Sequence, residues 1–279
     1  MIQDIAPHRF HNEFRCESPE PEDRVIHFSG KNILVRKERG SEPFPTLSML
    51  GQGIETIYLF SIDDHPYFLA LDDEVRIPEG FEYRNVKWYR FKAEGPKHQV
   101  FAAVTAYQLN NWYRGNRYCG TCGARMEVYH GAREIHCPDC GKIIYPRIVP
   151  AVIVGVLNGD RILLTRYLNS GGYQNHALIA GFTEIGETLE ETVRREVMEE
   201  TGIRVKNIRY YKSQPWGIVD DLLAGFYCDL DGDPTIRLQR DELKEGIWCP
   251  RDEVPDTPDD VSLTNEMILR FKEGKENVG

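Results

Sequence analysis

The sequence has no long hydrophobic run and no excess of basic residues, and each absence excludes a class of protein. Its longest apolar stretch covers residues 151–157, far short of the roughly 20 residues that a membrane-spanning helix needs. Lysine and arginine total 34 against 44 aspartate and glutamate residues, so the formal net charge is −10. Proteins that bind nucleic acid mainly through its phosphates are usually basic, so the composition disfavours broad, non-specific nucleic-acid binding. An anionic substrate would need positive charge supplied locally, by arginines or by a metal ion.

Features of a secreted protein are missing as well. The first residues, MIQDIAPH, contain neither the basic nor the apolar segment of a secretory signal. Four of the seven cysteines lie in two close pairs, and in a chain without an export signal paired cysteines are more often metal ligands than disulfides. We therefore expect a cytoplasmic protein.

What is present is the composition of a folded chain with more than one domain. Hydrophobic residues make up 41% of the 279 residues and charged residues 28%, a balance typical of globular proteins, and the length suggests about two domains. Short apolar runs at 25–28, 33–35, 56–60 and 67–71 are separated by turn-forming residues and predict a β-rich segment. Residues 98–113 contain no glycine or proline and predict a helix. We assign residues 1–113 to an N-terminal β-rich domain with this connecting helix.

The cysteine pairs form an array typical of a structural zinc site. A C-x2-C turn is repeated after a spacer of fourteen residues. Each turn directs two thiolates toward one point, and four thiolates complete a tetrahedron around Zn²⁺ that leaves no position open for a substrate. His130 and His136 offer alternative ligands, but four cysteines suffice. We predict a zinc ribbon at residues 114–145 that binds one structural Zn²⁺ per chain. The predicted ligands are Cys119, Cys122, Cys137 and Cys140.

A second helix is predicted directly after a loop that contains glycine. Thr188 and Glu191 form a capping-box pair that starts the helix, and Gly202 stands where a left-handed C-terminal cap belongs. Apolar residues recur every four positions between these two signals, which predicts one buried helix face. That face carries Leu189, Val193 and Val197.

Three glutamates of this helix share another face. Glu196, Glu199 and Glu200 are spaced i, i+3 and i+4, so their like charges repel one another. A hard divalent cation such as Mg²⁺ or Mn²⁺ would relieve that repulsion, because it prefers carboxylate oxygens and keeps waters that a phosphate can replace. A solvated acidic face is the alternative and is common on helices, but the surrounding pattern favours a metal site.

That pattern spans residues 181–203 and reads G-x5-E-x7-R-E-U-x-E-E-x-G-U, where U is apolar. Every specified position is filled, and a chance match of the seven fixed identities is on the order of one in 10⁸ at a given start point. The segment resembles the Nudix box, the signature of hydrolases that act on nucleoside diphosphates linked to another moiety. The resemblance implies an α/β fold class: a Nudix α/β/α sandwich over residues 146–279, preceded by the zinc ribbon and the β-rich domain.

The resemblance assigns a role to each fixed position of the box. Glu196, Glu199 and Glu200 would bind the catalytic Mg²⁺ or Mn²⁺, with Glu200 closest to the water-activating role. Arg195 would pair with Glu187 and fix the loop. The two remaining structural positions of the motif are Gly181 and Gly202.

A zinc ribbon directly before a Nudix domain resembles the NADH pyrophosphatase group in particular. The sequence LIAGF at 178–182, which enters the box, is similar to that group as well. There the residue matching Ala180 offers its backbone carbonyl to a metal, and the aromatic residue matching Phe182 stacks on a base. Tyr145 matches a tyrosine that contacts substrate. Arg90 matches a substrate arginine only by its distance from the first cysteine, and a solvated strand residue is an equal alternative.

A further metal ligand is implied after the box. Glu242 fits this place better than Asp241 or Glu245, because it directly precedes Leu243 and keeps the spacing to Trp248.

The segment 213–221 departs from the group's specificity marker. The marker reads SQPWPFPxS, whereas this chain has SQPWGIVDD. The match implies substrate contacts at Gln214, Pro215 and Trp216, with Asp221 at the last position, and an ordinary turn at 214–216 is the alternative. A carboxylate at Asp220 or Asp221 can accept hydrogen bonds from ribose hydroxyls but repels a phosphate. The reaction class is therefore better defined than the substrate.

The resemblance implies a homodimeric, metal-dependent enzyme that hydrolyses the pyrophosphate bond of NAD(H) to nicotinamide mononucleotide and AMP. One alternative is a Nudix hydrolase of ADP-ribose or another nucleoside-diphosphate conjugate, which the altered segment 217–221 favours. Another is removal of the NAD cap from RNA, which the ribbon permits and the net charge of −10 does not assist. A non-catalytic, ligand-sensing regulator is the alternative of a different class, and the complete set of glutamates argues against it. We expect no membrane partner.

Overall fold

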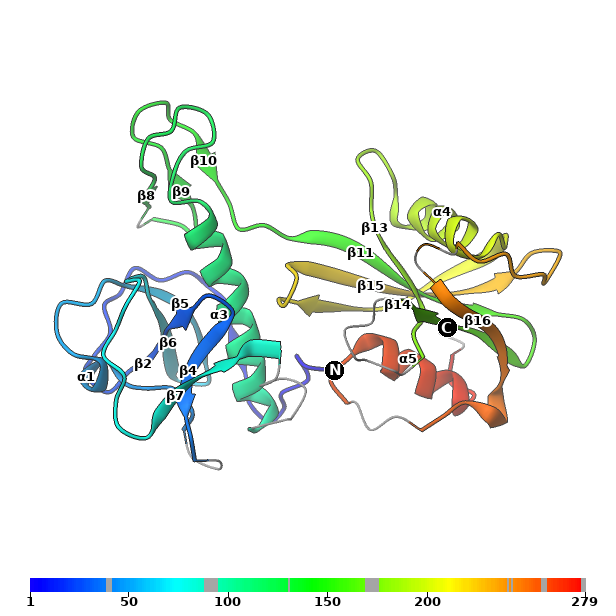
Figure 1. The fold of residues 1–279 in the computed structure, drawn as a ribbon, viewed down its shortest axis with the longest axis horizontal. Helices are drawn as coiled ribbons and strands as arrows, with labels where there is room; N and C mark the ends of the chain where they lie inside the picture. The colour runs from blue at the N-terminus through cyan, green and yellow to red at the C-terminus, as the bar shows by residue number, and fades with distance from the viewer. Residues whose placement is uncertain are drawn as a thin grey trace. The chain divides into compact units, whose positions relative to one another are not determined.

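The computed structural model describes residues 1–38, 42–87, 95–129, 131–168, 176–239, 241, 243–256 and 260–276. The chain divides into two compact units (Figure 1). One unit comprises residues 2–147 and 217–220, and the other comprises Met1 with residues 148–216 and 221–279.

The first unit begins with two small sheets and a long helix. Its four-stranded sheet has the order β1-β5-β6-β2, and its three-stranded sheet has the order β3-β4-β7. The predicted β-rich segment is confirmed, because each predicted run coincides with one or two of these strands. The helix predicted at 98–113 is also confirmed, as α3. The elements are β1 Phe10–His11, β2 Arg24–Ile26, β3 Phe28–Ser29, β4 Asn32–Arg36, α1 Leu47–Leu50, β5 Thr56–Ile62, β6 His65–Ala70, β7 Phe81–Asn85 and α3 Lys97–Gly115.

The cysteine-rich segment of this unit folds around three very short strands. These strands, β8 Glu127–Val128, β9 Ile135–His136 and β10 Ile143–Ile144, form an antiparallel sheet in the order β10-β9-β8. So little sheet buries little apolar surface, and small folds of this kind usually depend on a metal for their stability.

The second unit is a sheet between two helices. The main path of the sheet runs β14-β15-β11-β12-β16, and β13 pairs with β11. β11 and β15 are parallel, and the other pairs are antiparallel. The elements are β11 Val149–Leu157, β12 Arg161–Tyr167, β13 Ile179–Phe182, α4 Leu189–Thr201, β14 Val205–Trp216, β15 Asp221–Leu230, β16 Leu243–Pro250, a 3₁₀ turn Arg251–Glu253 and α5 Leu263–Lys272.

Alternation along β11 explains why both faces of this sheet are covered. Successive side chains of a strand point to opposite faces. Ala151 and Ile153 pack in one core cluster with residues of α5, whereas Val152 and Val154 pack in another with residues of α4. The expected α/β/α sandwich is therefore confirmed, with α4 on one face and α5 on the other (Figure 1).

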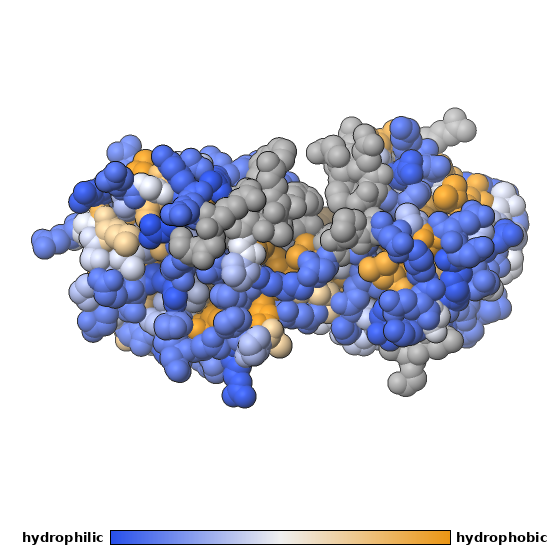
Figure 2. Space-filling view, turned by 90° about the horizontal axis from the view of Figure 1, so that it is seen from below, coloured by the Kyte–Doolittle hydropathy of each residue, from blue (hydrophilic) through white to orange (hydrophobic). Residues whose placement is uncertain are grey.

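The surface of the described residues is mostly hydrophilic. On the face shown in Figure 2, the coloured residues are mostly hydrophilic, and hydrophobic ones form small separate patches. No helix within the described ranges is long and apolar enough to cross a membrane.

Candidate active site and zinc site

The helix that carries the three glutamates starts and ends as its sequence predicts. The Thr188 side chain accepts a hydrogen bond from the backbone N–H of Glu191 at 3.2 Å, and the Glu191 carboxylate accepts one from the backbone N–H of Thr188 at 2.8 Å. Gly202 ends α4 in the left-handed conformation, at φ 68°. These two caps define where the helix begins and ends. Val193 and Val197 between them are buried against the sheet.

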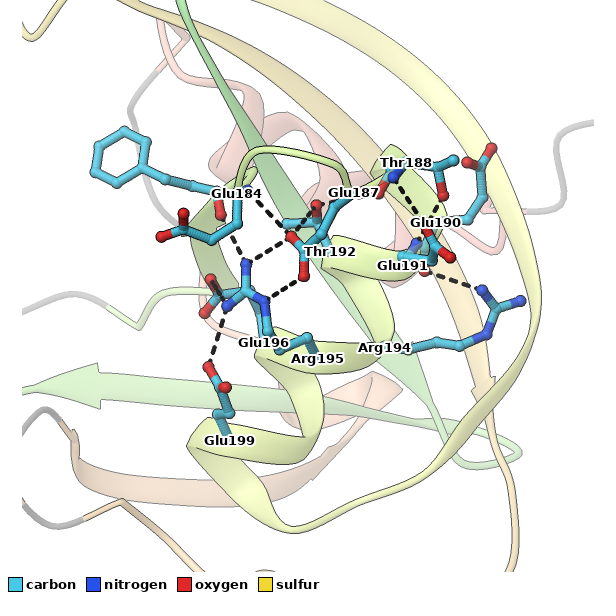
Figure 3. Close-up of polar contacts among 11 residues, drawn as sticks. Glu184, Glu187, Thr188, Glu190, Glu191, Thr192, Arg194, Arg195, Glu196 and Glu199 are labelled. Atoms are coloured by element: carbon cyan, nitrogen blue, oxygen red, sulfur yellow. Dashed lines mark hydrogen bonds and ion pairs between the residues drawn. The ribbon is translucent and has the colours of Figure 1, made fainter.

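Arg195 ties the loop before α4 to the helix (Figure 3). Its guanidinium donates two hydrogen bonds to the Glu187 carboxylate, at 2.6 and 2.9 Å, and a third to the carbonyl of Phe182 at 2.8 Å. The Arg195 guanidinium and the backbone N–H of Glu184 together hold the pKa of Glu187 at about 2. The predicted pairing of Arg195 with Glu187 is confirmed, and it also anchors the end of β13.

The three glutamates differ in exposure although they share one helix. The side chain of Glu199 is 53% exposed and that of Glu196 is 13% exposed, whereas Glu200 is only 1% exposed. Arg195 donates to Glu196 at 2.7 Å and to Glu199 at 3.0 Å, and thereby offsets part of their repulsion. The three carboxylates do not converge on one point. The four cysteines are the metal-ligand cluster found in the described part of the chain.

Gly181 lets β13 approach the helix closely. A methyl group at this position would overlap the carboxylate of Glu196. Any larger residue would therefore displace that carboxylate, which accounts for glycine at the first fixed position of the box.

A cavity of about 530 Å³ lies beside this glycine. Five predicted site residues line it: Ala180, Gly181, Phe182, Glu196 and Asp221. The cavity thus joins the start of the Nudix box to the first residue of β15. The lining residues that sequence reasoning missed are Ala151, Tyr167, Leu168, Glu184 and Leu223.

The residues after the box are only partly described. Asp241 lines the cavity, although Glu242 matches the expected ligand better. Glu245 forms an ion pair with Arg166 at 3.3 Å. Glu242, Arg90 and His130 lie outside the described residues.

Gln214 requires a correction. Its side chain is buried, and its amide donates to the carbonyl of Val261 and accepts from the backbone N–H of Leu263, both at 2.7 Å. It therefore fixes the start of α5 and has no surface to offer a substrate. The alternative of an ordinary turn at 214–216 is wrong as well, because these residues end strand β14. Pro215 is exposed, and Trp216 packs partly against the core beside α5.

Tyr145 belongs to the first unit, where its side chain is exposed. A hydrogen bond with the carboxylate of Glu134 raises the pKa of its phenol. The same carboxylate lies 2.7 Å from the Nε2 atom of His136. His136 is therefore engaged by Glu134, not by the cysteine cluster.

The four cysteines have the geometry of a zinc site. The Sγ atoms of Cys119 and Cys140 are 3.6 Å apart, and those of Cys122 and Cys137 are 3.4 Å apart. Ligands about 2.3 Å from a tetrahedral Zn²⁺ are about 3.8 Å from one another, so the cluster fits the ion. Backbone N–H groups of Cys122 and Thr121 lower the pKa of the Cys119 thiol to about 6.

The chain is similar to known proteins over both regions described above. A model of the Nudix domain matches residues 146–270, and a model of the NADH pyrophosphatase zinc ribbon domain matches residues 114–145. A curated protein of Actinobacillus succinogenes named NAD-capped RNA hydrolase NudC is 36% identical over 213 residues, covering 74% of this chain and 78% of that protein. A protein of the same name from Pseudomonas aeruginosa is 35% identical, and the match covers 72% of this chain and 71% of that protein.

A solved Nudix hydrolase of Nitrosomonas europaea matches with a TM-score of 0.49 at 23% identity, covering 57% of this chain and 92% of that one. The chain belongs to the Nudix hydrolase family, among the members that carry an NADH pyrophosphatase zinc ribbon.

Proposed function

We propose that this enzyme hydrolyses the pyrophosphate bond of NAD(H) and releases nicotinamide mononucleotide and AMP. The observation that carries the proposal is the cavity in which the start of the Nudix box, Glu196 and the half-exposed ring of Phe182 meet. The relatives named NAD-capped RNA hydrolase support a substrate that contains NAD.

The donor type of the cavity fits a hard divalent cation, because carboxylate oxygens are the ligands that Mg²⁺ and Mn²⁺ prefer, although the three glutamates of α4 do not converge on one point. All charged side chains among the described residues that line the cavity are carboxylates, so a bound pyrophosphate would be repelled without a cation. Mg²⁺ or Mn²⁺ would be held by Glu196, Glu199 and Glu200, with the carbonyl of Ala180 and with Glu242. When bound, the ion offsets the phosphate charge and lowers the pKa of a coordinated water.

The chain's own residues then orient the reaction. Gly181 leaves room for the Glu196 carboxylate, and Arg195 holds the loop through Glu187. Phe182 stacks on a base of the dinucleotide. The buried carboxylate of Glu200 accepts a proton from the attacking water, whose oxygen bonds to one phosphorus while the bridging P–O bond breaks.

The contacts to the rest of the substrate belong to the same proposal. The residues that would contact the substrate are Tyr145, Pro215, Trp216 and Asp221. Arg90 would add positive charge. Gln214 is left out because its buried amide is hydrogen-bonded to the backbone of Val261 and Leu263.

The NAD cap of an RNA 5′ end is the second candidate substrate. The same bond would be cleaved in it, and the relatives named NAD-capped RNA hydrolase favour it. ADP-ribose remains a third candidate, because the segment 217–221 departs from the NADH pyrophosphatase marker.

A substrate panel tests the proposal. NADH, NAD, ADP-ribose and NAD-capped RNA are each incubated with Mg²⁺ or Mn²⁺, and the products are separated by chromatography. We expect AMP and nicotinamide mononucleotide from the free dinucleotides. Absence of AMP from both dinucleotides would refute the proposal.

A pair of matched variants tests the site. Glu200→Gln removes the charge of the buried carboxylate, whereas Glu190→Gln makes the same change at an exposed position of α4. We expect Glu200→Gln to lose at least 100-fold in kcat and Glu190→Gln to retain wild-type activity. Equal activity of the two variants would contradict the assignment.

We also propose that the protein is a cytoplasmic homodimer. The four paired cysteines form a metal-ligand cluster, not disulfides, as expected in a reducing compartment. The dimer rests on the resemblance to the NADH pyrophosphatase group alone, and light scattering of the purified protein tests it.

A further inference from the structure

A second cavity, of about 450 Å³, lies within the first unit, where the zinc ribbon meets the β-rich domain and the end of α3. Its lining contains no residue of the Nudix box and none of the proposed substrate contacts. Its volume lies in the range of small-molecule sites, about 300–1,000 Å³. Hydrolysis in the Nudix domain therefore leaves this cavity without a role.

An exposed tyrosine and an exposed arginine stand side by side at this cavity. Tyr118 and Arg125 are directly opposite each other in an antiparallel bridge, so their side chains leave the same face with Cβ atoms about 5 Å apart. Tyr118 is 68% exposed. Arg125 is exposed and forms no ion pair within the described ranges. An aromatic ring and a free guanidinium presented together can stack on a base and bind a phosphate.

The first cysteine turn holds these two residues in place. The backbone N–H of Cys119 donates to the carbonyl of Ala124 at 2.8 Å, and the N–H of Met126 donates to that of Arg117 at 2.9 Å. Tyr118 and its partner across the bridge lie between these two hydrogen bonds. The pair is therefore arranged before any ligand binds, which lowers the entropy cost of binding.

The other charged groups of the lining balance one another. Asp73 accepts hydrogen bonds from Arg114 and Arg117, both at 2.6 Å. The Asp72 carboxylate accepts one from the backbone N–H of Glu55 at 2.8 Å, and the Glu55 side chain is exposed. Three carboxylates thus offset three guanidinium groups, so a bare anion gains no net attraction. A ligand with both an anionic group and hydroxyl groups matches this set, because a hydroxyl donates to a carboxylate such as that of Glu55.

Tyr113 supplies one more donor in the wall of the cavity. It is 5% exposed, and its hydroxyl has no hydrogen-bond partner in the part of the chain that the structure describes. Burial raises the pKa of this phenol to about 12, so the hydroxyl keeps its proton at neutral pH. A buried hydroxyl without a partner costs free energy, and an oxygen atom of a ligand would satisfy it.

We propose that this cavity is a second, non-catalytic binding site, and that its ligand is a ribonucleotide. The base stacks on Tyr118, the phosphate binds Arg125, and a ribose hydroxyl donates to Glu55. The ligand is either a free nucleotide or one unit of an RNA chain, because both present the same base, ribose and phosphate. The site is independent of the reaction proposed for the Nudix domain.

Calorimetric titration of the zinc-loaded protein tests the site. The probes are AMP and a six-nucleotide oligoadenylate, added without Mg²⁺ or Mn²⁺. Tyr118→Ala removes the ring and Arg125→Gln removes the charge, whereas Tyr210→Ala and Arg161→Gln make the same changes at exposed positions of the other unit. We expect each cavity variant to bind at least one probe about tenfold more weakly than wild type. The two control variants should keep wild-type affinity.

The ribose contact has a test of its own. The 2′-deoxy form of the bound probe should bind wild type more weakly than the ribose form, because it has one hydroxyl fewer to donate. Glu55→Ala should remove this difference. Equal affinity of wild type for the two forms would show that the site does not select a ribonucleotide.

The outcomes also identify the source of the ligand. Weaker binding of AMP by the cavity variants identifies a free nucleotide, and weaker binding of the oligoadenylate alone identifies an RNA chain. Wild-type affinity for both probes in Tyr118→Ala and Arg125→Gln overturns the proposal, as does a wild type that binds neither probe. Both substituted side chains are exposed, so we expect both variants to fold.

Discussion

Gly181→Ala offers a sharp test of how the Nudix box builds its metal site. The added methyl group would overlap the carboxylate of Glu196. That carboxylate is the end of a flexible side chain, so it will swing away while the strand stays in place. The proposed metal ligand would then be displaced without any change in the charge of the protein.

The two free-energy terms for folding nearly cancel. Losing the hydrogen bond from Arg195 to Glu196 costs about 0.5–1.5 kcal/mol. Replacing glycine by alanine inside a strand stabilises the folded state by about 0.5–1 kcal/mol. The free energy of unfolding should therefore change by less than about 1 kcal/mol, and Tm by less than about 4 °C.

The effect on metal binding should be much larger. Removal of an outer-shell partner already lowers metal affinity 10–100-fold, so displacement of Glu196 should lower it by at least that factor. Titration of activity with Mn²⁺ measures the affinity, and a thermal melt measures Tm.

Gly155→Ala is the matched control in the neighbouring strand β11. Its Cβ would lie 2.8 Å from the ring of Tyr227, which is buried and donates a hydrogen bond to the carbonyl of Met267. This ring cannot move aside, so overpacking should cost about 1–3 kcal/mol of stability with metal affinity unchanged. Wild-type Mn²⁺ affinity in Gly181→Ala would refute the reasoning.

Three further predictions concern the loop before α4, the zinc ribbon and the start of α5. The pKa of Glu187 is lowered in the folded state to about 2 from an ordinary value of 4.5, so its stabilising effect is complete above pH 4.5 and is lost as the pH falls through 2. Unfolding curves of Glu187→Gln should therefore differ from wild type at pH 6 and converge near pH 2, and a constant difference would contradict this. Cys137→Ser should bind less than one Zn²⁺ per chain by elemental analysis and melt at lower temperature, whereas Cys16→Ser, at an exposed cysteine outside the cluster, should match wild type. Gln214→Ala should lower the free energy of unfolding by about 1–3 kcal/mol, because a buried backbone N–H at Leu263 and a partly buried carbonyl at Val261 lose their partner. A raised KM with unchanged stability would instead restore Gln214 as a substrate contact.

Local signals account for the parts of the structure that the sequence predicts well. The capping residues Thr188 and Glu191, the final Gly202 and the apolar spacing between them act within one helix. The two cysteine turns are likewise local, and Gly123 and Gly141 adopt positive φ angles after them, at 78° and 72°. Such features depend little on distant residues, so a sequence pattern is enough to find them.

Contacts between distant segments explain what the sequence could not show. Gln214 looks like part of a substrate marker, but its partners lie 47 and 49 residues further along the chain. The cavity draws Ala151, Leu168 and Leu223 from strands or strand ends far apart in the sequence. None of these residues belongs to a motif, and only the pairing of β11 with β12, β13 and β15 brings their strands together.

This enzyme cleaves a pyrophosphate bond with the help of a divalent cation. The most direct measurement is a product analysis after incubation with NAD, with Mg²⁺ or Mn²⁺ present and then with both removed by chelation. Our account predicts nicotinamide mononucleotide and AMP in equal amounts, formed only when the cation is present and not formed by Glu200→Gln. Free nicotinamide with ADP-ribose, or cation-independent formation of AMP, would contradict it.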